Sequence, residues 1–256
     1  MRTDEDNLWA AHRNFVGSFE KLVEHQPGGS TRRFGSVFAF VSRLPVALFN
    51  GLVLLEPTGP SDLDAAADWL HAAEMPHEAF LRQPASEEPA KQLEARGFER
   101  RPWVQPVMEI VPPLSPPRPR GGVSVRAVVD EAGLAEHVDH MIASGNPEPM
   151  VRSLYTPAFA FDPEVRLFTG YLDGRPMGNA IAIRTGETSG VYAVGTRPEA
   201  RGRGLGTAAT WAAIDAGRQW GCARVVLQSS EMGFGVYSAM GFQVIDRLVL
   251  LRARSR

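Results

Sequence analysis

The chain has 256 residues and a formal net charge of −2, and 44% of its residues are hydrophobic, which is ordinary for a globular protein with its own core. Its two halves carry nearly balanced charge, which argues against nucleic-acid binding, and its longest apolar run, residues 46–55, is much shorter than the ~20 residues that span a bilayer. The single cysteine, Cys222, excludes an intrachain disulfide, and the acidic N-terminus lacks the apolar stretch of a secretory signal. We therefore expect a cytoplasmic protein that binds neither nucleic acid nor membrane.

A proline-rich segment, residues 111–121, divides the chain into two predicted domains, residues 1–110 and residues 122–256. In the first, Ser61 and Asp64 have the spacing of a capping box at the start of a helix, and Gly97 is expected to end a later one. The hydrophobic pattern predicts helices over residues 4–25, 61–74 and 86–98, and strands over residues 36–42, 45–56, 78–83 and 103–111.

The second domain begins with an expected strand over residues 122–129 and a helix over residues 130–145 that Asp130 caps. The sequence DGRP at residues 173–176 is a hairpin signal between two apolar segments. Further strands are expected over residues 165–172, 177–185, 189–196, 223–230 and 244–253, and further helices before residue 220 and over residues 231–242.

The two domains end alike. Leu93 precedes Gly97-Phe98 at the spacing at which Tyr237 precedes Gly241-Phe242. This self-similarity favours two related halves. They differ between strand and helix, where the second domain has the glycine-rich segment GTRPEARGRGLGT, residues 195–207, and the first has LEPTGPSD.

The glycine-rich segment places Arg201, Gly202, Arg203, Gly204 and Gly206 within six positions, just before a predicted helix. The first amides of a helix have no intrahelical acceptor and attract anions. Glycines remove the Cβ atoms that would keep a phosphate away, and guanidinium groups suit phosphate oxygens. The segment therefore predicts a pyrophosphate site at a strand-to-helix junction, with a solvated turn as the alternative. Its spacing fits neither the dinucleotide fingerprint nor the P-loop.

Val194 to Gly206 resembles the acetyl-CoA signature R/Q-x-x-G-x-G/A of the GCN5-related N-acetyltransferases (GNAT family). Arg201, Gly204 and Gly206 stand at its fixed positions. The resemblance covers residues 122–256, and residues 1–110 suggest a degenerate second copy. It implies the acyl-CoA N-acyltransferase fold, an α/β fold with a mixed, mostly antiparallel central sheet flanked by helices.

Tyr237, four residues before Gly241-Phe242, matches a tyrosine that this family carries on its last helix. The resemblance implies an acetyl-CoA-dependent N-acetyltransferase that moves an acetyl group to a primary amine by direct attack, with Tyr237 as the general acid. In such proteins the strand before the signature pairs with the pantetheine arm, and the amides after it hold the pyrophosphate. The implied acetyl-CoA-binding residues are Val194, Gly195, Thr196, Arg201, Gly202, Arg203, Gly204, Leu205, Gly206, Thr207 and Ser230.

Two residues depart from the family pattern. Ser230 stands where members often carry asparagine, and Gly233 stands where they often carry alanine. Ser230 has a shorter reach toward acetyl-CoA, and the glycine lowers the helix propensity of this segment.

A general base is not apparent in the sequence. Glu187, in a predicted turn, and Glu231, at the start of the last helix, are expected to be solvated or capping residues. His137 and His140 lie one helical turn apart, but no third ligand accompanies them, so we expect a solvated helix face and no metal.

The acceptor is expected to be a small-molecule amine, because a second half would help to wall an enclosed pocket, to which Trp103 or Asn50 could contribute. The expected oligomeric state is a monomer or a homodimer. A non-catalytic module that binds or senses acyl-CoA is the alternative function. Arginine-glycine RNA binding is a third, which the balanced charge disfavours.

Overall fold

The computed structural model describes residues 4–83, 85–111 and 121–254, so most of the proline-rich segment lies outside the described residues. The chain forms two compact units, each built from separate stretches of sequence. The loop unit, which contains the glycine-rich segment, comprises Met1–Asn14, Glu109–Leu227 and Gly235–Gln243. The N-terminal unit comprises Phe15–Met108, Gln228–Phe234 and Val244–Arg256. Both are discontinuous, whereas the predicted domains are continuous.

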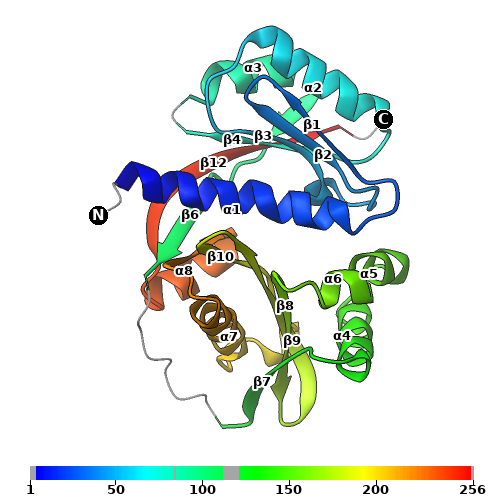
Figure 1. Ribbon diagram of the computed structural model, residues 1–256, viewed down its shortest axis with the longest axis vertical. Helices are drawn as coiled ribbons and strands as arrows, with labels where there is room; N and C mark the ends of the chain where they lie inside the picture. The colour runs from blue at the N-terminus through cyan, green and yellow to red at the C-terminus, as the bar shows by residue number, and fades with distance from the viewer. Residues whose placement is uncertain (1–3, 84, 112–120, 255–256) are drawn as a thin grey trace. The chain divides into compact units, whose positions relative to one another are not determined.

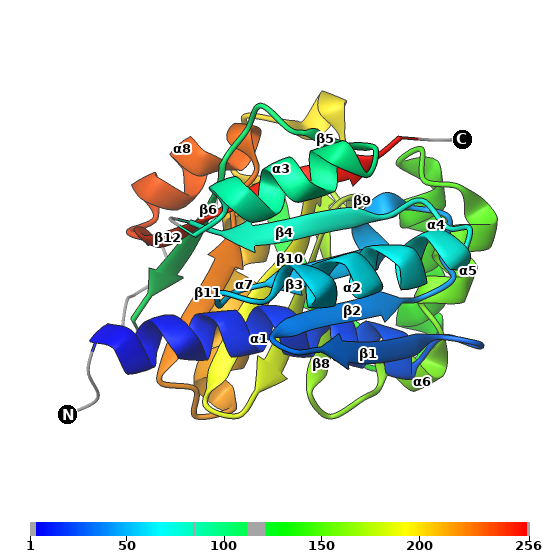
Figure 2. The same cartoon turned by 90° about the horizontal axis from the view of Figure 1, so that it is seen from above.

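A mixed sheet forms the centre of the N-terminal unit, with the strand order β1-β2-β3-β4-β12-β6 and with β5 paired to β12. β3 and β4 are parallel, whereas β12 is antiparallel to β4. Figure 2 looks onto α2 and α3, which lie beside each other over the strands β2, β3 and β4. The elements are α1 (Asp4–Glu24, shared with the loop unit), β1 (Ser30–Phe34), β2 (Val37–Val41), the 3-10 helix η1 (Ala47–Phe49), β3 (Asn50–Leu54), α2 (Pro60–Ala72), β4 (Glu78–Arg82), α3 (Glu87–Ala95), β5 (Phe98–Arg100), β6 (Gln105–Ile110) and β12 (Gln243–Ala253).

The strand β2 is buried along its whole length because helices cover both of its faces. Phe40 points toward α1, where Phe19 stacks on it with ring centroids 4.0 Å apart. Val37, Ala39 and Val41 lie on the opposite face and pack with α2. Burial on both faces explains why this strand reads as a continuous apolar run rather than an alternating one.

The loop unit is built on the strands β11-β10-β9-β8-β7, which are neighbours in that order. β10 and β11 are parallel, and the other neighbouring strands in this series are antiparallel. Figure 1 shows α7 on one face of these strands and α4, α5 and α6 on the other. The elements are β7 (Val123–Ala127), α4 (Glu131–Ala143), α5 (Glu148–Leu154), α6 (Pro157–Ala160), β8 (Val165–Leu172), β9 (Arg175–Thr185), β10 (Thr188–Thr196), the 3-10 helix η2 (Pro198–Ala200), α7 (Leu205–Gln219), β11 (Arg224–Gln228) and α8 (Glu231–Ala239).

The two units share one topological step. In each, antiparallel strands lead to a strand, a crossover helix and a parallel strand: β3, α2 and β4 in the N-terminal unit, and β10, α7 and β11 in the loop unit. A short helix follows each parallel strand and ends at a glycine with positive φ, +89° at Gly97 and +97° at Gly241. The predicted mixed sheet and the likeness of the two halves are therefore confirmed.

The final strand, β12, belongs to the N-terminal unit although it follows α8 in sequence. Leu250 pairs with Phe80 of β4 in the antiparallel register, and Val249 and Leu251 pack in the core beneath α2 and α3. The end of β6 belongs in turn to the loop unit, where Glu109 forms an ion pair with Arg224 of β11. The last strand of each half thus contributes to the unit built mainly from the other half.

Several local predictions differ from the structure. α2 begins at Pro60 after Gly59, and no side chain caps it, so the capping box predicted at Ser61 and Asp64 is wrong. The cap at Asp130 is confirmed, since its carboxylate accepts the Gly133 amide at 2.7 Å. The sequence did not indicate β1, β5, α5 or α6. Among the described residues, no helix has both the length and the apolar character that a membrane span requires.

Replacing Leu251 by alanine tests the position of β12. Leu251 is fully buried in the core of the N-terminal unit, so we expect Leu251→Ala to lower the free energy of unfolding by about 2–5 kcal/mol. Leu48 is 43% exposed, and Leu48→Ala, the matched control, should change it by less than about 0.5 kcal/mol. Urea unfolding followed by circular dichroism measures both. Equal effects of the two substitutions would contradict the placement of β12.

Candidate active site

The strands β10 and β11 pair at only three positions, from Thr188↔Arg224 to Gly190↔Val226. β10 then continues to Thr196. Within the described residues, this last part of β10 has no strand partner on the β11 side. An unpaired strand edge can bind an extended chain through its backbone N–H and C=O groups.

A β-bulge lies in the same part of β10. The register with β9 shifts between Tyr192 and Gly195, and Ala193 has a φ of +48°. The side-chain amide of Asn179 donates a hydrogen bond to the Ala193 carbonyl, and the Tyr192 hydroxyl donates one to Asn14 Oδ1 at 2.6 Å. A bulge bends its strand and increases the local twist, which accounts for the divergence of β10 from β11. The contacts of Asn179 and Asn14 with this bulge could not be predicted from the sequence, because each joins residues that are distant in sequence.

The glycine-rich segment turns into α7 through Gly202 and Gly204, whose φ values are +72° and +86°. The first intrahelical hydrogen bond runs from the Ala208 amide to the Gly204 carbonyl at 3.0 Å. The amides of residues 205–207 therefore have no intrahelical acceptor and lie at the positive end of the helix dipole. The first turn of α7 contains no acidic residue, so the helix start is suited to an anion.

Leu205 anchors the start of α7 on the sheet. It is buried against Leu172 and Ala200. Gly170 of β8 and Gly178 of β9 face each other across the strand pair, and a Cβ atom at either would lie within 3.0 Å of the Leu205 side chain. This pair of glycines provides the space that lets α7 approach so closely.

Arg201 and Arg203 are exposed, and the other predicted residues of the segment are half-buried, apart from the exposed Gly202 and the buried Leu205. Arg201 Nε donates to the Thr196 carbonyl at 3.4 Å, which folds its side chain over the segment. A Cβ atom at Gly202 would meet nothing within 4 Å, so the approach to this part of the segment is open.

Tyr237 lies on α8, which follows β11. Because β10 and β11 are parallel, the connections to α7 and α8 leave the sheet at the same edge. The Tyr237 ring packs edge-on against Phe242 at a centroid distance of 5.9 Å, and its hydroxyl has no hydrogen-bond partner among the described residues. Burial raises the pKa of Tyr237 above its ordinary value, so the phenol keeps its proton at neutral pH.

The corresponding helix of the N-terminal unit, α2, begins very differently. Its first residue, Pro60, has no amide hydrogen, and Asp62 places a carboxylate in the first turn. The Thr58 hydroxyl lies 3.3 Å from that carboxylate. The start of α2 therefore already holds a negative charge and is unsuited to a phosphate.

Comparison with protein families concerns the loop unit. Residues 135–242 match the model of the Acetyltransferase (GNAT) family. These residues belong to the GNAT family. The GNAT domain includes the divergent strands β10 and β11, the glycine-rich segment and Tyr237. The family match makes it an acyltransferase domain of a family that uses acetyl-CoA. No curated protein matches the sequence.

Solved structures extend the likeness to both halves. A GCN5-related N-acetyltransferase from Kribbella flavida superposes with a TM-score of 0.70 at 20% identity, over 95% of each chain. One from Sphaerobacter thermophilus gives 0.62 at 21% identity, over 86% of this chain and 77% of its own. A tandem GNAT protein from the clavulanic acid biosynthesis pathway gives 0.58 at 15% identity, over 90% of this chain and 85% of its own. At these identities the likeness shows the fold alone, and it confirms the predicted acyl-CoA N-acyltransferase fold.

The three polar residues that the sequence offered near the site lie at the start of α8 and in a turn before β10. Ser230 is exposed, and its Oγ accepts the Gly233 amide at 3.2 Å at the start of α8. Glu231 is the exposed first residue of that helix. Glu187 is exposed in the turn before β10, at the opposite end of this strand from the glycine-rich segment. None of these positions identifies a general base.

The two residues suggested for an acceptor pocket have structural roles. Asn50 is fully buried, accepts the Ser42 amide at 2.9 Å and donates to the Leu44 carbonyl at 2.9 Å, so its predicted projection into a pocket is wrong. Trp103 donates its indole N–H to the Ser229 carbonyl at 3.0 Å, which ties it to the residues before α8.

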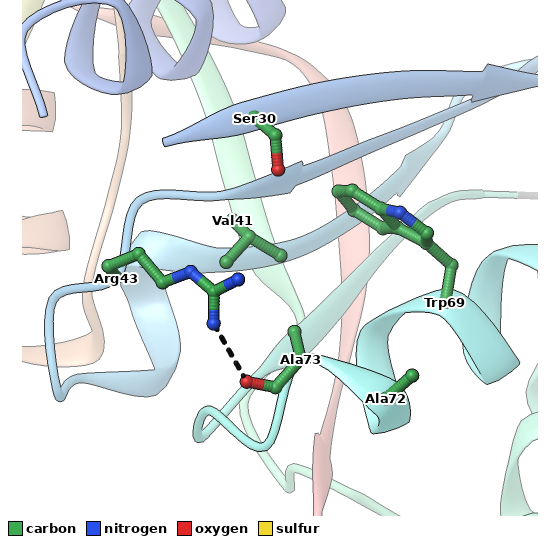
Figure 3. A pocket seen from close by; sticks show the side chains of 6 residues that line it. All are labelled: Ser30, Val41, Arg43, Trp69, Ala72 and Ala73. Carbon is green, nitrogen blue, oxygen red and sulfur yellow. Dashed lines mark hydrogen bonds between the residues drawn. The ribbon is translucent and has the colours of Figure 1, made fainter. Parts of the chain in front are cut away.

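A shallow cavity of about 160 Å³ lies in the N-terminal unit, and its lining residues are far in sequence from the glycine-rich segment. Arg43 lines this cavity, and its guanidinium group donates a hydrogen bond to the Ala73 carbonyl at 3.1 Å (Figure 3). A basic side chain that binds a carbonyl at the C-terminal end of a helix is a common cap. The structural role of Arg43 therefore explains the polar part of this cavity. Its lining residues are Ser30, Val41, Arg43, Trp69, Ala72 and Ala73.

His137 and His140 are buried on the face of α4 that packs on the sheet, so the predicted solvated face is wrong. His137 Nδ1 lies 2.9 Å from Thr169 Oγ1, and its ring packs edge-on against Tyr155. Burial, with a smaller contribution from His140, lowers the pKa of His137 to about 4. Burial also lowers the pKa of His140, although the neighbouring Asn179 side chain opposes the shift.

Acid should destabilise the protein through His137. Between pH 6.5 and about 4, this histidine is protonated in the unfolded chain but neutral in the folded one, so stability falls as the pH falls through this window. The shift corresponds to about 3 kcal/mol at most. We expect His137→Gln, which keeps a hydrogen-bonding group, to flatten this dependence.

The measurement is urea unfolding of both proteins at intervals from pH 8 to pH 4. At pH 8 both side chains are uncharged, so the difference there reports altered packing alone. Stability curves that remain parallel down to pH 4 would show that His137 does not contribute.

Proposed function

We propose that the protein is an acetyl-CoA-dependent N-acetyltransferase that moves an acetyl group to the primary amine of a small molecule. The observation that carries the proposal is the start of α7, where amides without intrahelical acceptors and a turn of glycines follow a strand with an unpaired edge. A pyrophosphate suits the helix start, and an extended pantetheine arm suits the strand edge.

Binding of acetyl-CoA would use three groups of residues. Backbone groups of Val194, Gly195 and Thr196 would pair with the pantetheine arm, and Ser230 would contact it from the start of α8. The amides at the start of α7 would hold the pyrophosphate, with Arg201 and Arg203 neutralising its charge. The residues proposed for the pyrophosphate are Arg201, Gly202, Arg203, Gly204, Leu205, Gly206 and Thr207.

Tyr237 would act as the general acid. As the amine nitrogen bonds to the acetyl carbonyl carbon and the carbon–sulfur bond breaks, the sulfur leaves with the electron pair and takes the phenolic proton. A thiol has a pKa of ~8.5 and a free phenol of ~10, so this transfer is uphill by about 2 kcal/mol before the raised pKa of Tyr237 is added. That cost is small compared with the stabilisation gained when the proton neutralises the negative charge on the leaving sulfur. The amine must be unprotonated when it attacks, and its nitrogen releases a further proton as the amide forms, which restores the phenol of Tyr237 through solvent. We assign no residue to either proton removal.

We propose a small molecule as the acceptor because the chain carries a further GNAT-like half in addition to its GNAT domain. The chemistry fits a reducing cytoplasm, in which coenzyme A stays a thiol and the buried Cys222 stays reduced. We propose a monomer or homodimer that requires no metal. The alternative is a module that binds acyl-CoA without transferring the acyl group.

Replacing Tyr237 by phenylalanine should lower kcat by at least tenfold, because the leaving sulfur would lose its proton donor. The affinity for coenzyme A should change by less than about threefold, because ring packing against Phe242 is kept. Release of free thiol from acetyl-CoA in the presence of a panel of amines measures the first, and calorimetry measures the second. Tyr155→Phe, which removes another phenol hydroxyl of the loop unit, is the matched control. An unchanged kcat would remove the general-acid role.

Replacing Thr207 by glutamate separates helix stability from phosphate binding. Thr207 is the third residue of α7, where a carboxylate stabilises a helix by about 0.3–1 kcal/mol. The same carboxylate should repel a pyrophosphate and weaken coenzyme A binding by at least tenfold. Thr207→Gln, its neutral counterpart, should bind within about threefold of the unmodified protein. Equal affinities of the two variants in calorimetry would place the pyrophosphate elsewhere.

The same amine panel distinguishes the transferase from the binding module. A transferase releases thiol faster in the presence of at least one amine, whereas a module binds coenzyme A without turnover on any of them.

A further inference from the structure

The bulge of β10 contains a conformation that needs support. Ala193 has a φ of +48°, in the left-handed region where the Cβ atom of an alanine crowds the following carbonyl oxygen. Such a residue persists only where its surroundings hold it in place. The described contacts of this bulge therefore indicate what holds it.

Asn179 of β9 supplies that contact. Its side-chain amide donates to the Ala193 carbonyl, and its own backbone is in register with Gly195. A Cβ atom at Gly195 would lie 2.6 Å from Asn179 Oδ1, so the side chain lies directly over this glycine. Asn179 is 6% exposed, whereas Ala193 itself is exposed.

The side of the sheet on which Asn179 lies is fixed by its neighbours. Gly178, one residue earlier, faces Leu205 of α7, so Asn179 faces the opposite side, where α4 packs. There it lies beside His140, whose lowered pKa the Asn179 side chain opposes. The amide nitrogen of Asn179 donates to the Ala193 carbonyl.

The residue before the bulge is held independently. The Tyr192 hydroxyl donates to Asn14 Oδ1 at 2.6 Å, and Asn14 Nδ2 donates to the carbonyls of Ile183 and Thr188 at 3.0 and 3.2 Å. Loss of the Asn179 contact would therefore release the bulge without releasing the rest of β10.

The planar peptide bond between Ala193 and Val194 links the direction of the Ala193 carbonyl to that of the Val194 N–H. In a trans peptide the carbonyl of residue 193 and the amide N–H of residue 194 point in opposite directions. Because the Ala193 carbonyl points to the Asn179 side chain, the Val194 N–H points away from that side chain. Within the described residues, β11 does not pair with this part of β10.

We propose that Asn179 is a positioning residue of the acyl-CoA site: by holding the Ala193 carbonyl it aims the Val194 amide at the bound acyl-CoA. The inference rests on the proposed function. It adds a side chain that does not touch acyl-CoA itself, and it makes the affinity for coenzyme A depend on a buried amide on the neighbouring strand.

The test uses Asn179→Asp, which keeps the size of the side chain but replaces the amide donor by an acceptor. We expect the dissociation constant for coenzyme A, measured by calorimetry, to rise at least tenfold. Thr169→Val is the matched control, because Thr169 pairs with Asn179 across the strands and faces α4 but does not touch the bulge. Its dissociation constant should stay within about twofold.

A second substitution provides a rescue that a merely structural role of Asn179 would not allow. Glycine adopts positive φ without strain, so Ala193→Gly should restore at least part of the affinity when combined with Asn179→Asp. Should Asn179→Asp fail to fold, Asn179→Ala removes the donor without adding a buried charge, and the same pair of measurements applies.

The outcomes separate this inference from the function on which it rests. If the unmodified protein does not bind coenzyme A, the proposed function is wrong and this inference is overturned with it. If the unmodified protein binds and the Asn179 variants bind equally well, only the positioning role is overturned. Equal losses in the Thr169 and Asn179 variants, or no rescue by Ala193→Gly, would likewise overturn it.

Discussion

Backbone amides without a protein partner are the constraint around which the GNAT domain is organised. A buried amide without a partner is costly, so it must face water or a ligand. Within the described residues, the first turn of α7 has amides without an intrahelical acceptor, and β10 beyond Gly190 has no strand partner on the β11 side. Both lie where the chain passes from strand to helix. The glycine pair beneath Leu205 and the bulge at Ala193 are the local features that keep this junction in shape.

The two halves of the chain show that the same scaffold can lack this property. α2 and α7 each connect two parallel strands, and each is followed by a short helix that ends at a glycine. The difference lies within one helical turn: Pro60 removes an amide and Asp62 supplies a charge in α2, whereas α7 begins with glycines and carries no acid there. Whether a half has a helix start suited to an anion is therefore decided by a few residues and not by its fold.

Much of this fold was predictable because its signals are local. Helical periodicity, the Asp130 cap and the glycine-rich segment each involve residues close in sequence, and each predicted its element correctly. Period-2 alternation, by contrast, states which face of a strand is buried but not which strand lies beside it. The alternation in β12 therefore did not indicate that this strand belongs to the N-terminal unit.

The polar residues were harder to place for the same reason. His137, His140 and Asn50 are types that are usually exposed, and only tertiary packing buries them. The contacts of Asn14 and Asn179 with the bulge join distant parts of the chain, and a single sequence carries no signal for them. The glycine-rich segment and Tyr237 could be proposed from the sequence because their motifs are short. The contacts that hold β10 in place could not.

The place of β12 also has a consequence for the order of folding during synthesis. Ribosomes make a chain from its N-terminus at about 5–20 residues per second, and domains generally fold as they emerge. The core of the N-terminal unit is incomplete without Val249 and Leu251, which are translated only after the GNAT domain at residues 135–242. The strands β2, β3 and β4 must therefore wait until that domain has been synthesised before their core is complete, and until then their apolar side chains lack part of their packing.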